Sequence, residues 1–275
     1  MIRKAIRLIG YTIGSITKGS REYVVHDFGE NTFIGYFDFN PNEYVNDKVV
    51  YHNVSCDSNR QVLPEVADIM VADLNGESSY RVCSSRAINL QLGSRVRFIS
   101  ADLIALNNIE DGKQHTEVWN FKTKERVNTF NLPFWNWNGT ERFFVGLNFA
   151  NLHQNRPGYG YGSQHRFLSK EVLYTVDLIS GIENVVTANE VSNSLGLSLK
   201  AKYYFNHVSF RPNSDQFISI LLWESRGIRY LAPFLTDKSF SFFKKIECDH
   251  YFSHHCWLES DVLLVYARLK GQKRP

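Results

Sequence analysis

Short runs in which apolar and polar residues alternate, separated by Gly, Pro, Asn and Asp, dominate this chain. A period of two is typical of half-buried strands, and stripes with a helical period are scarce. The pattern predicts strands at residues 21–28, 32–39, 48–52, 68–73, 79–84, 96–106, 115–121 and 126–131. Asn-Gly or Asp-Gly pairs at 75–76, 111–112 and 138–139 favour tight hairpin turns. We therefore predict an all-β protein.

One short sequence motif is repeated along the chain. Phe-Asn-Pro-Asn at 39–42 recurs as Phe-Arg-Pro-Asn at 210–213, and a β-rich run follows each copy. Aromatic anchors also precede strand-like runs at Phe98, Trp137 and Trp257. Self-similarity at a period of roughly 40–50 residues is typical of propeller blades. We predict a β-propeller of four-stranded blades.

The N-terminal segment differs from the rest. Residues 1–20 are basic and contain no acid, and their apolar stretch is interrupted by Arg7, Gly10 and Gly14. This pattern fits neither a signal peptide nor a membrane span, although contact with an anionic surface stays open. The four cysteines are widely spaced and lack a C-x-x-C motif, which favours free thiols in a reducing compartment. We expect a cytoplasmic protein with its propeller at 21–275.

Charge excludes one class of partner. The 275 residues carry a formal net charge of +3, and no stretch interleaves basic and aromatic side chains densely. A nucleic-acid groove needs such a stretch, so we expect no nucleic-acid partner.

The longest step between anchors runs from Trp137 to Phe210, which predicts an inserted loop at about 151–170. Loops on a propeller face often carry binding residues because the blades are rigid. The candidate substrate-binding residues of this loop, suited to sugar rings and carboxylates, are Arg156, Tyr159, Tyr161 and Arg166. A merely solvated insert is the alternative interpretation.

Two histidines share a position relative to the anchors. His207 lies three residues before Phe210, and His254 lies three residues before Trp257. Because the inner strands of a propeller converge on a channel, the same offset would bring both imidazoles to one channel mouth. Imidazole binds transition metals and acts as a base near neutral pH, although a lone His is as often structural. On a regular strand His255 would face away from His254.

The segments Asn-His-Val-Ser-Phe-Arg-Pro at 206–212 and Ser-His-His-Cys-Trp at 253–257 resemble the oligogalacturonate lyases. These are seven-bladed propellers that cleave unsaturated-ended pectin fragments by β-elimination. The resemblance implies that His207 is the catalytic base and His254 a manganese ligand. It also implies that five to six of seven blades are present here, in an incomplete ring. The loop Arg-Pro-Gly-Tyr-Gly-Tyr at 156–161 resembles that of uncharacterised bacterial relatives associated with surface polysaccharides.

The chain also departs from the lyase pattern. The Gln-x-x-His-x-His segment that completes the metal site of the lyases does not occur before Pro275, and Val172 replaces their Arg. We therefore expect a carbohydrate-interacting propeller that binds or acts on an acidic oligosaccharide or polysaccharide. The alternatives are a metal-dependent lyase in a longer form of the protein, with Arg156 or Arg166 on the uronate carboxylate, and a non-catalytic scaffold for a protein partner.

Overall fold

A computed structural model describes residues 31–36, 38, 45, 47–54, 65–74, 78–156, 158–162, 171–197, 201–248 and 251–268. The predicted strand at 21–28, the repeat at 39–42, the Asn-Gly pair at 75–76 and the loop residue Arg166 lie outside these residues.

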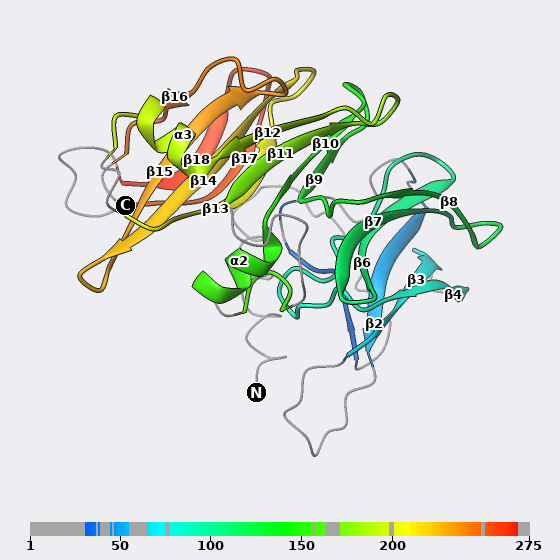
Figure 1. The fold of residues 1–275 in the computed structure, drawn as a ribbon. Coiled ribbons are helices and arrows are strands. Elements are labelled where there is room, and N and C mark those ends of the chain that lie inside the picture. The colour runs from blue at the N-terminus through cyan, green and yellow to red at the C-terminus, as the bar shows by residue number, and fades with distance from the viewer. Residues whose placement is uncertain are drawn as a thin grey trace, which may run out of the picture.

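The described part of the chain forms four four-stranded antiparallel sheets and a two-stranded one (Figure 1). Blade 1 contains β1 (Thr32–Phe33), β2 (Lys48–Val54), β3 (Ala67–Asp73) and β4 (Ser79–Ser85). Blade 2 contains β5 (Arg97–Phe98), β6 (Leu103–Glu110), β7 (Lys113–Asn120) and β8 (Glu125–Phe130). Blade 3 contains β9 (Asn136–Asn138), β10 (Phe143–Leu147), β11 (Val172–Asp177) and β12 (Glu183–Thr187). Blade 4 contains β13 (Tyr203–Phe210), β14 (Gln216–Ser225), β15 (Ile228–Asp237) and β16 (Lys244–Lys245). The fifth sheet contains β17 (Phe252–Trp257) and β18 (Leu263–Ala267).

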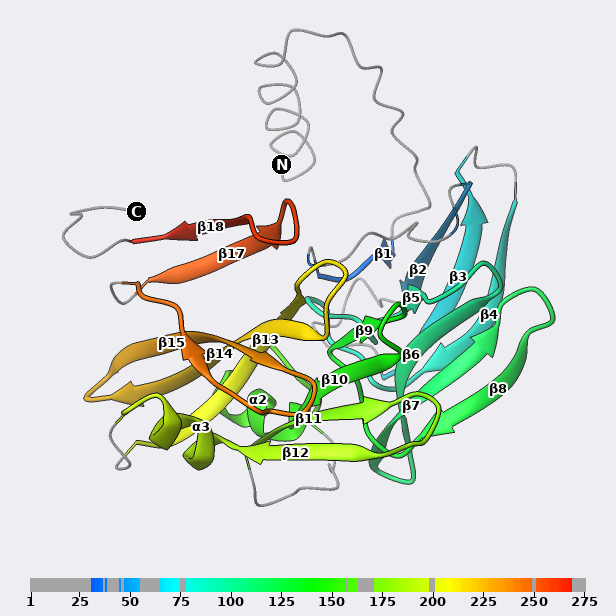
Figure 2. The same cartoon turned by 90° about the horizontal axis from the view of Figure 1, so that it is seen from above.

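The first strands of the sheets meet at a common centre. Residues of β5, β9, β13 and β17, with Tyr36 and Asp38 after β1, line a single cavity. Figure 2 shows the sheets following one another around this centre in chain order. Radial sheets with their first strands innermost make a propeller-like arrangement, which confirms the predicted all-β class and the four-stranded blades.

Most strand predictions agree with the structure, but 96–106 does not form one strand. The backbone turns after β5, where the Ser100 hydroxyl accepts from the N–H groups of Asp102 and Leu103 at 3.3 and 3.2 Å. A serine that bonds to nearby backbone N–H groups competes with the sheet ladder. The Asp111-Gly112 hairpin is confirmed: its φ angles are 49° and 74°, as a tight turn between right-twisted strands requires.

The predicted insert begins as a helix rather than a loop. Helix α2 (Phe149–Asn155) starts at Asn148, whose side chain accepts from the N–H of Asn151. This N-cap satisfies a backbone donor that the first helical turn leaves open. Helix α3 (Ala188–Ser194) follows β12 and starts with a capping box between Thr187 and Glu190. Among the described residues, no helix is both apolar enough and long enough to span a bilayer.

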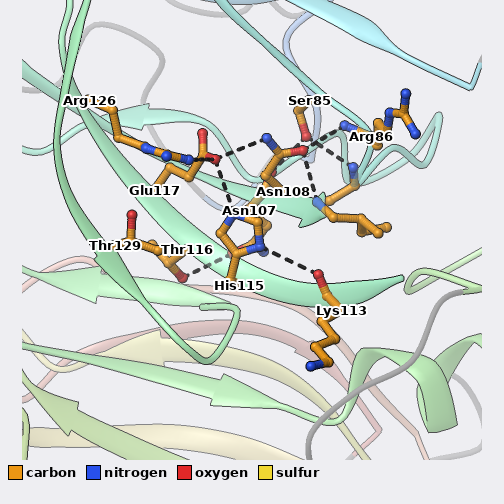
Figure 3. Close-up of polar contacts among 12 residues, drawn as sticks. Ser85, Arg86, Asn107, Asn108, Lys113, His115, Thr116, Glu117, Arg126 and Thr129 are labelled. Atoms are coloured by element: carbon orange, nitrogen blue, oxygen red, sulfur yellow. Dashed lines mark hydrogen bonds and ion pairs between the residues drawn. The ribbon is translucent and has the colours of Figure 1, made fainter. Parts of the chain in front are cut away.

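Blade 2 contains a polar network around the buried carboxylate of Glu117 (Figure 3). It accepts from Trp119 Nε1 at 2.7 Å, from Arg126 at 2.9 Å and from Asn108 Nδ2 at 3.2 Å. His115 Nε2 lies 3.0 Å from the same carboxylate. Burial alone would raise the pKa of Glu117, but these bonds lower it to about 2. The network therefore keeps an ionised carboxylate inside blade 2.

Of the cysteines that the structure describes, Cys83 and Cys256 are free thiols as expected.

Candidate functional site

The candidate site is the cavity of about 900 Å³ at the centre of the sheets. Its wall combines aromatic rings, amides, hydroxyls, imidazoles and guanidinium groups from the first strands of successive blades. These strands are fixed to one another: Asn136 Nδ2 donates to Val208 O at 3.1 Å, and Trp257 Nε1 donates to Ser209 O at 3.4 Å. The cavity wall is therefore set by the fold before any ligand binds.

An ion pair closes the wall near β5. Arg95, whose side chain is 1% exposed, donates to the two oxygens of Asp38 at 2.8 and 3.0 Å. Trp135 Nε1 donates to the same carboxylate at 3.1 Å. Burial would raise the pKa of Asp38, but the Arg95 guanidinium holds it below its usual range. Asp38 is thus ionised and engaged in this pair, and its charge is neutralised.

His207 occupies a bulge in β13. The register shifts between Asn206 and Val208, and His207 itself has φ of 58°. Its ring stacks on Tyr36 at 5.4 Å and meets Trp135 edge-on at 5.5 Å. Among the described residues neither ring nitrogen has a hydrogen-bond partner. Burial lowers the pKa of His207 to about 3, although Asp38 opposes the shift, so this imidazole is neutral at pH 7.

A second bulge brings two more imidazoles to the cavity. The register of β17 shifts between Phe252 and His255, so His254 and His255 both line the wall instead of alternating as a regular strand would. The His255 ring lies 6.4 Å from that of His207, and its Nε2 is buried without a hydrogen-bond partner among the described residues. Burial lowers the pKa of His255. His254 is exposed and lies 3.0 Å from the Ser253 hydroxyl.

Two arginines contribute guanidinium groups to the wall. Arg97 donates to Asn136, and Arg211 donates to Gln216 Oε1 at 2.8 Å and to the Ser260 carbonyl. Among the described lining residues Asp38 is the sole carboxylate, and Arg95 neutralises it. The described part of the wall thus combines guanidinium groups with a carboxylate that is already paired.

The loop residues lie behind this wall. Arg156 covers the Tyr159 ring at 4.0 Å and donates to its hydroxyl at 3.3 Å. Tyr159 meets Tyr36 edge-on at 6.0 Å, and Tyr36 in turn stacks on His207. Tyr161 is 2% exposed; it donates to Gly93 O and accepts from Asn107 at 3.2 Å, so its ring supports the fold. Arg156 and Tyr159 are thus connected to the cavity through Tyr36.

The sequence interpretation missed Tyr36, Asp38, Arg95 and Arg97. A signal for two of them was present, because Tyr36 and Arg95 lie three residues before the anchors Phe39 and Phe98, as His207 does before Phe210. Arg95 also shares the left-handed backbone of His207, with φ of 60°. The same offset therefore marks Tyr36 and His207 in the cavity wall and Arg95 in the ion pair beside it.

The manganese site expected at His254 stays a prediction, because the described residues provide only part of a ligand set. Among the described residues no group of three or more His, Cys, Asp or Glu side chains could hold a metal ion. Transition metals need several such donors around one point.

No family model matches the chain, and no curated protein does. Its solved structural neighbours include the β-propeller domain of the Trilobed protease from Pyrococcus furiosus, with 11% identity and a TM-score of 0.46 over 82% of this chain and 61% of that one. TolB from Acinetobacter baumannii has 13% identity and a TM-score of 0.47 over 83% and 49%. An acylaminoacyl peptidase has 12% identity and a TM-score of 0.43 over 81% and 41%. The chain thus spans about half the length of these structures, and no function is transferred from them.

Proposed function

We propose that the protein binds an acidic oligosaccharide or polysaccharide in the central cavity. The observation that carries this proposal is the composition of the wall: Arg97, Arg211 and three imidazoles surround a space whose carboxylate is already paired. Guanidinium groups bind carboxylates through charge-assisted hydrogen bonds. The volume of about 900 Å³ falls in the range of ligand sites.

Aromatic rings complete the match to a sugar. Tyr36, Phe210 and Trp257 line the same wall as the arginines. Ring faces suit the apolar faces of pyranose rings, while the amides of Asn136 and Asn138 suit hydroxyl groups. A uronate chain presents all three chemistries at once, which a simple inorganic anion does not.

Calorimetric titration with a short oligogalacturonate, and with an uncharged oligosaccharide of the same length, tests the proposal. We expect the acidic ligand to bind and the neutral one to bind far more weakly. Arg211→Gln should weaken binding roughly tenfold to a hundredfold, because a hydrogen bond between charged groups contributes about 1.5–3 kcal/mol. Arg86→Gln is the matched control, since Arg86 is an exposed arginine outside the cavity lining. Equal affinity of both variants would contradict the site.

The lyase alternative has one specific observation in its favour. His207 presents a neutral imidazole to the cavity, where it can accept the C5 proton of a uronate while the C4–O bond breaks and the C4–C5 double bond forms. A pKa of about 3 makes it a weak base, which favours binding over elimination. The ultraviolet absorbance of unsaturated uronate distinguishes the two, because it rises only if elimination occurs and must be lost in His207→Ala. The manganese ligand role of His254 stays a prediction that depends on further donors.

A further inference from the structure

The fifth sheet exposes an unusual amount of apolar surface. The fifth-sheet patch consists of Tyr251, Leu258, Val262, Leu264 and Tyr266, all exposed large apolar residues within one short stretch. Leu264 and Tyr266 on β18 are 57% and 52% exposed. The alternate β18 residues, Leu263, Val265 and Ala267, pack against the main core. Strand β18 is therefore apolar on both faces, as an interior strand would be.

Within the described residues, no strand pairs with the outer edge of β18. In the described part of the chain β18 pairs with β17 alone, whereas each blade has four strands. Val262 O and Arg268 N bond toward the β17 side, to Leu258 N and Tyr251 O. Because bonding direction alternates along an antiparallel strand, Leu263, Val265 and Ala267 direct their N–H and C=O groups to the open edge.

The described residues of β18 carry none of the features that usually prevent edge pairing. Natural edge strands carry charges, prolines or bulges that prevent a further strand from adding. Residues 263–267 read Leu-Leu-Val-Tyr-Ala and contain no charge and no proline. The register shift of this sheet lies in β17, not in β18. The edge is therefore ready to accept a strand that is also apolar on both faces.

We propose that a second copy of this chain pairs with the open edge of β18 across a twofold axis. Antiparallel pairing centred on Val265 joins β17 and β18 of both copies into one four-stranded antiparallel sheet, the strand number of every described blade. Val265 lies on the twofold axis and directs its own N–H and C=O to the open edge. The two copies of Val265 can therefore bond to each other through both groups. Leu264 then packs against Tyr266 of the partner subunit, and this contact occurs twice. The interface does not depend on the proposed ligand.

Light scattering of the full chain after gel filtration, over a range of concentrations, tests the interface. We expect the mass of two chains. Leu264→Lys/Tyr266→Lys places lysines opposite lysines of the partner and should give the mass of one chain. Leu264→Glu/Tyr266→Lys carries equally polar side chains but places Glu opposite Lys, so it should keep the dimer, and salt should weaken that dimer more than the original one.

Ile179→Lys/Ile182→Lys is the control, because these residues are exposed apolar positions near β12 and their loss should leave the mass of two chains. Far-ultraviolet circular dichroism checks that each variant is folded. A single-chain mass for the unaltered protein at every concentration, a larger closed or open assembly, or identical behaviour of the two charged pairs would overturn the proposal.

Discussion

Replacing Glu117 with Gln tests whether the polar network of blade 2 depends on charge. The carboxylate is 2% exposed and accepts bonds from three elements of the blade. Its pKa is lowered from 4.5 to about 2. A pKa that differs by one between the folded and unfolded chain corresponds to about 1.4 kcal/mol, so the ionised form contributes about 3 kcal/mol to folding at pH 5 and above.

The sign follows from the direction in which the pKa moves. A carboxyl group with a lowered pKa binds protons more readily in the unfolded chain, so its contribution is present above about pH 4.5 and is lost as the pH falls toward about 2. Burial alone would lower the pKa of His115, but its bond to Glu117 raises it, so its own contribution is present below its ordinary pKa and is lost as the pH rises. In the original protein His115 is protonated at both pH 5 and pH 3, so its own titration adds little between these two values.

Urea unfolding at the two pH values measures the contribution. The difference in unfolding free energy between the original protein and Glu117→Gln should fall from about 3 kcal/mol at pH 5 to about 1.5 kcal/mol at pH 3. Glu110→Gln, at an exposed end of β6, should show a small difference at both. A Glu117→Gln difference that is the same at pH 5 and pH 3 would refute the electrostatic explanation, because loss of packing alone does not depend on protonation.

Two further substitutions test the packing behind the cavity. Gly146→Ala would bring a methyl group to 2.3 Å from Pro133 O and 2.4 Å from the Tyr174 ring. It should therefore lower the unfolding free energy, measured by urea titration, by about 1–3 kcal/mol. Gly162→Ala, where the added methyl group has room, should be nearly neutral. Asp38→Asn removes the carboxylate that pairs with the buried Arg95 and should lower the unfolding free energy by about 3–5 kcal/mol. The double variant Asp38→Asn/Arg95→Met should restore part of this loss. No recovery in the double variant would show that the two residues are not coupled.

The sequence predicted the sheets well because alternation and turn residues are local signals. The two-residue turn at Asp111-Gly112 follows directly from the left-handed backbone that its residues tolerate. The break between β5 and β6 was missed because Ser100 ends β5 through side-chain bonds that the apolar pattern does not reveal. Ion pairs between residues far apart in the sequence could not be predicted either, because Asp38 contacts Arg95 only where two blades converge.

Candidate site residues could be predicted where they occupy a backbone position that repeats from blade to blade. They could not be predicted where a tertiary contact determines the role of the side chain. Tyr161 is a residue type that often binds sugars, yet its hydroxyl bonds to Asn107 and to the Gly93 carbonyl in the protein interior. Arg166 remains a prediction, because it lies outside the described residues. The offset and the resemblance to the lyases both singled out His207, but its neutral state at pH 7 follows from burial that the sequence does not show.

The repeated offset explains how one backbone plan provides different chemistry in each blade. Arg95 and His207 both adopt a left-handed conformation that costs a side-chain-bearing residue roughly 1 kcal/mol or more, and both lie three residues before an aromatic anchor. In blade 3 the same offset places Phe134, which is fully buried. The position thus carries a cation bound in a salt bridge, a packed ring or a neutral imidazole facing the cavity. One backbone position therefore serves an ion pair, core packing and the cavity wall in different blades of the same propeller-like fold.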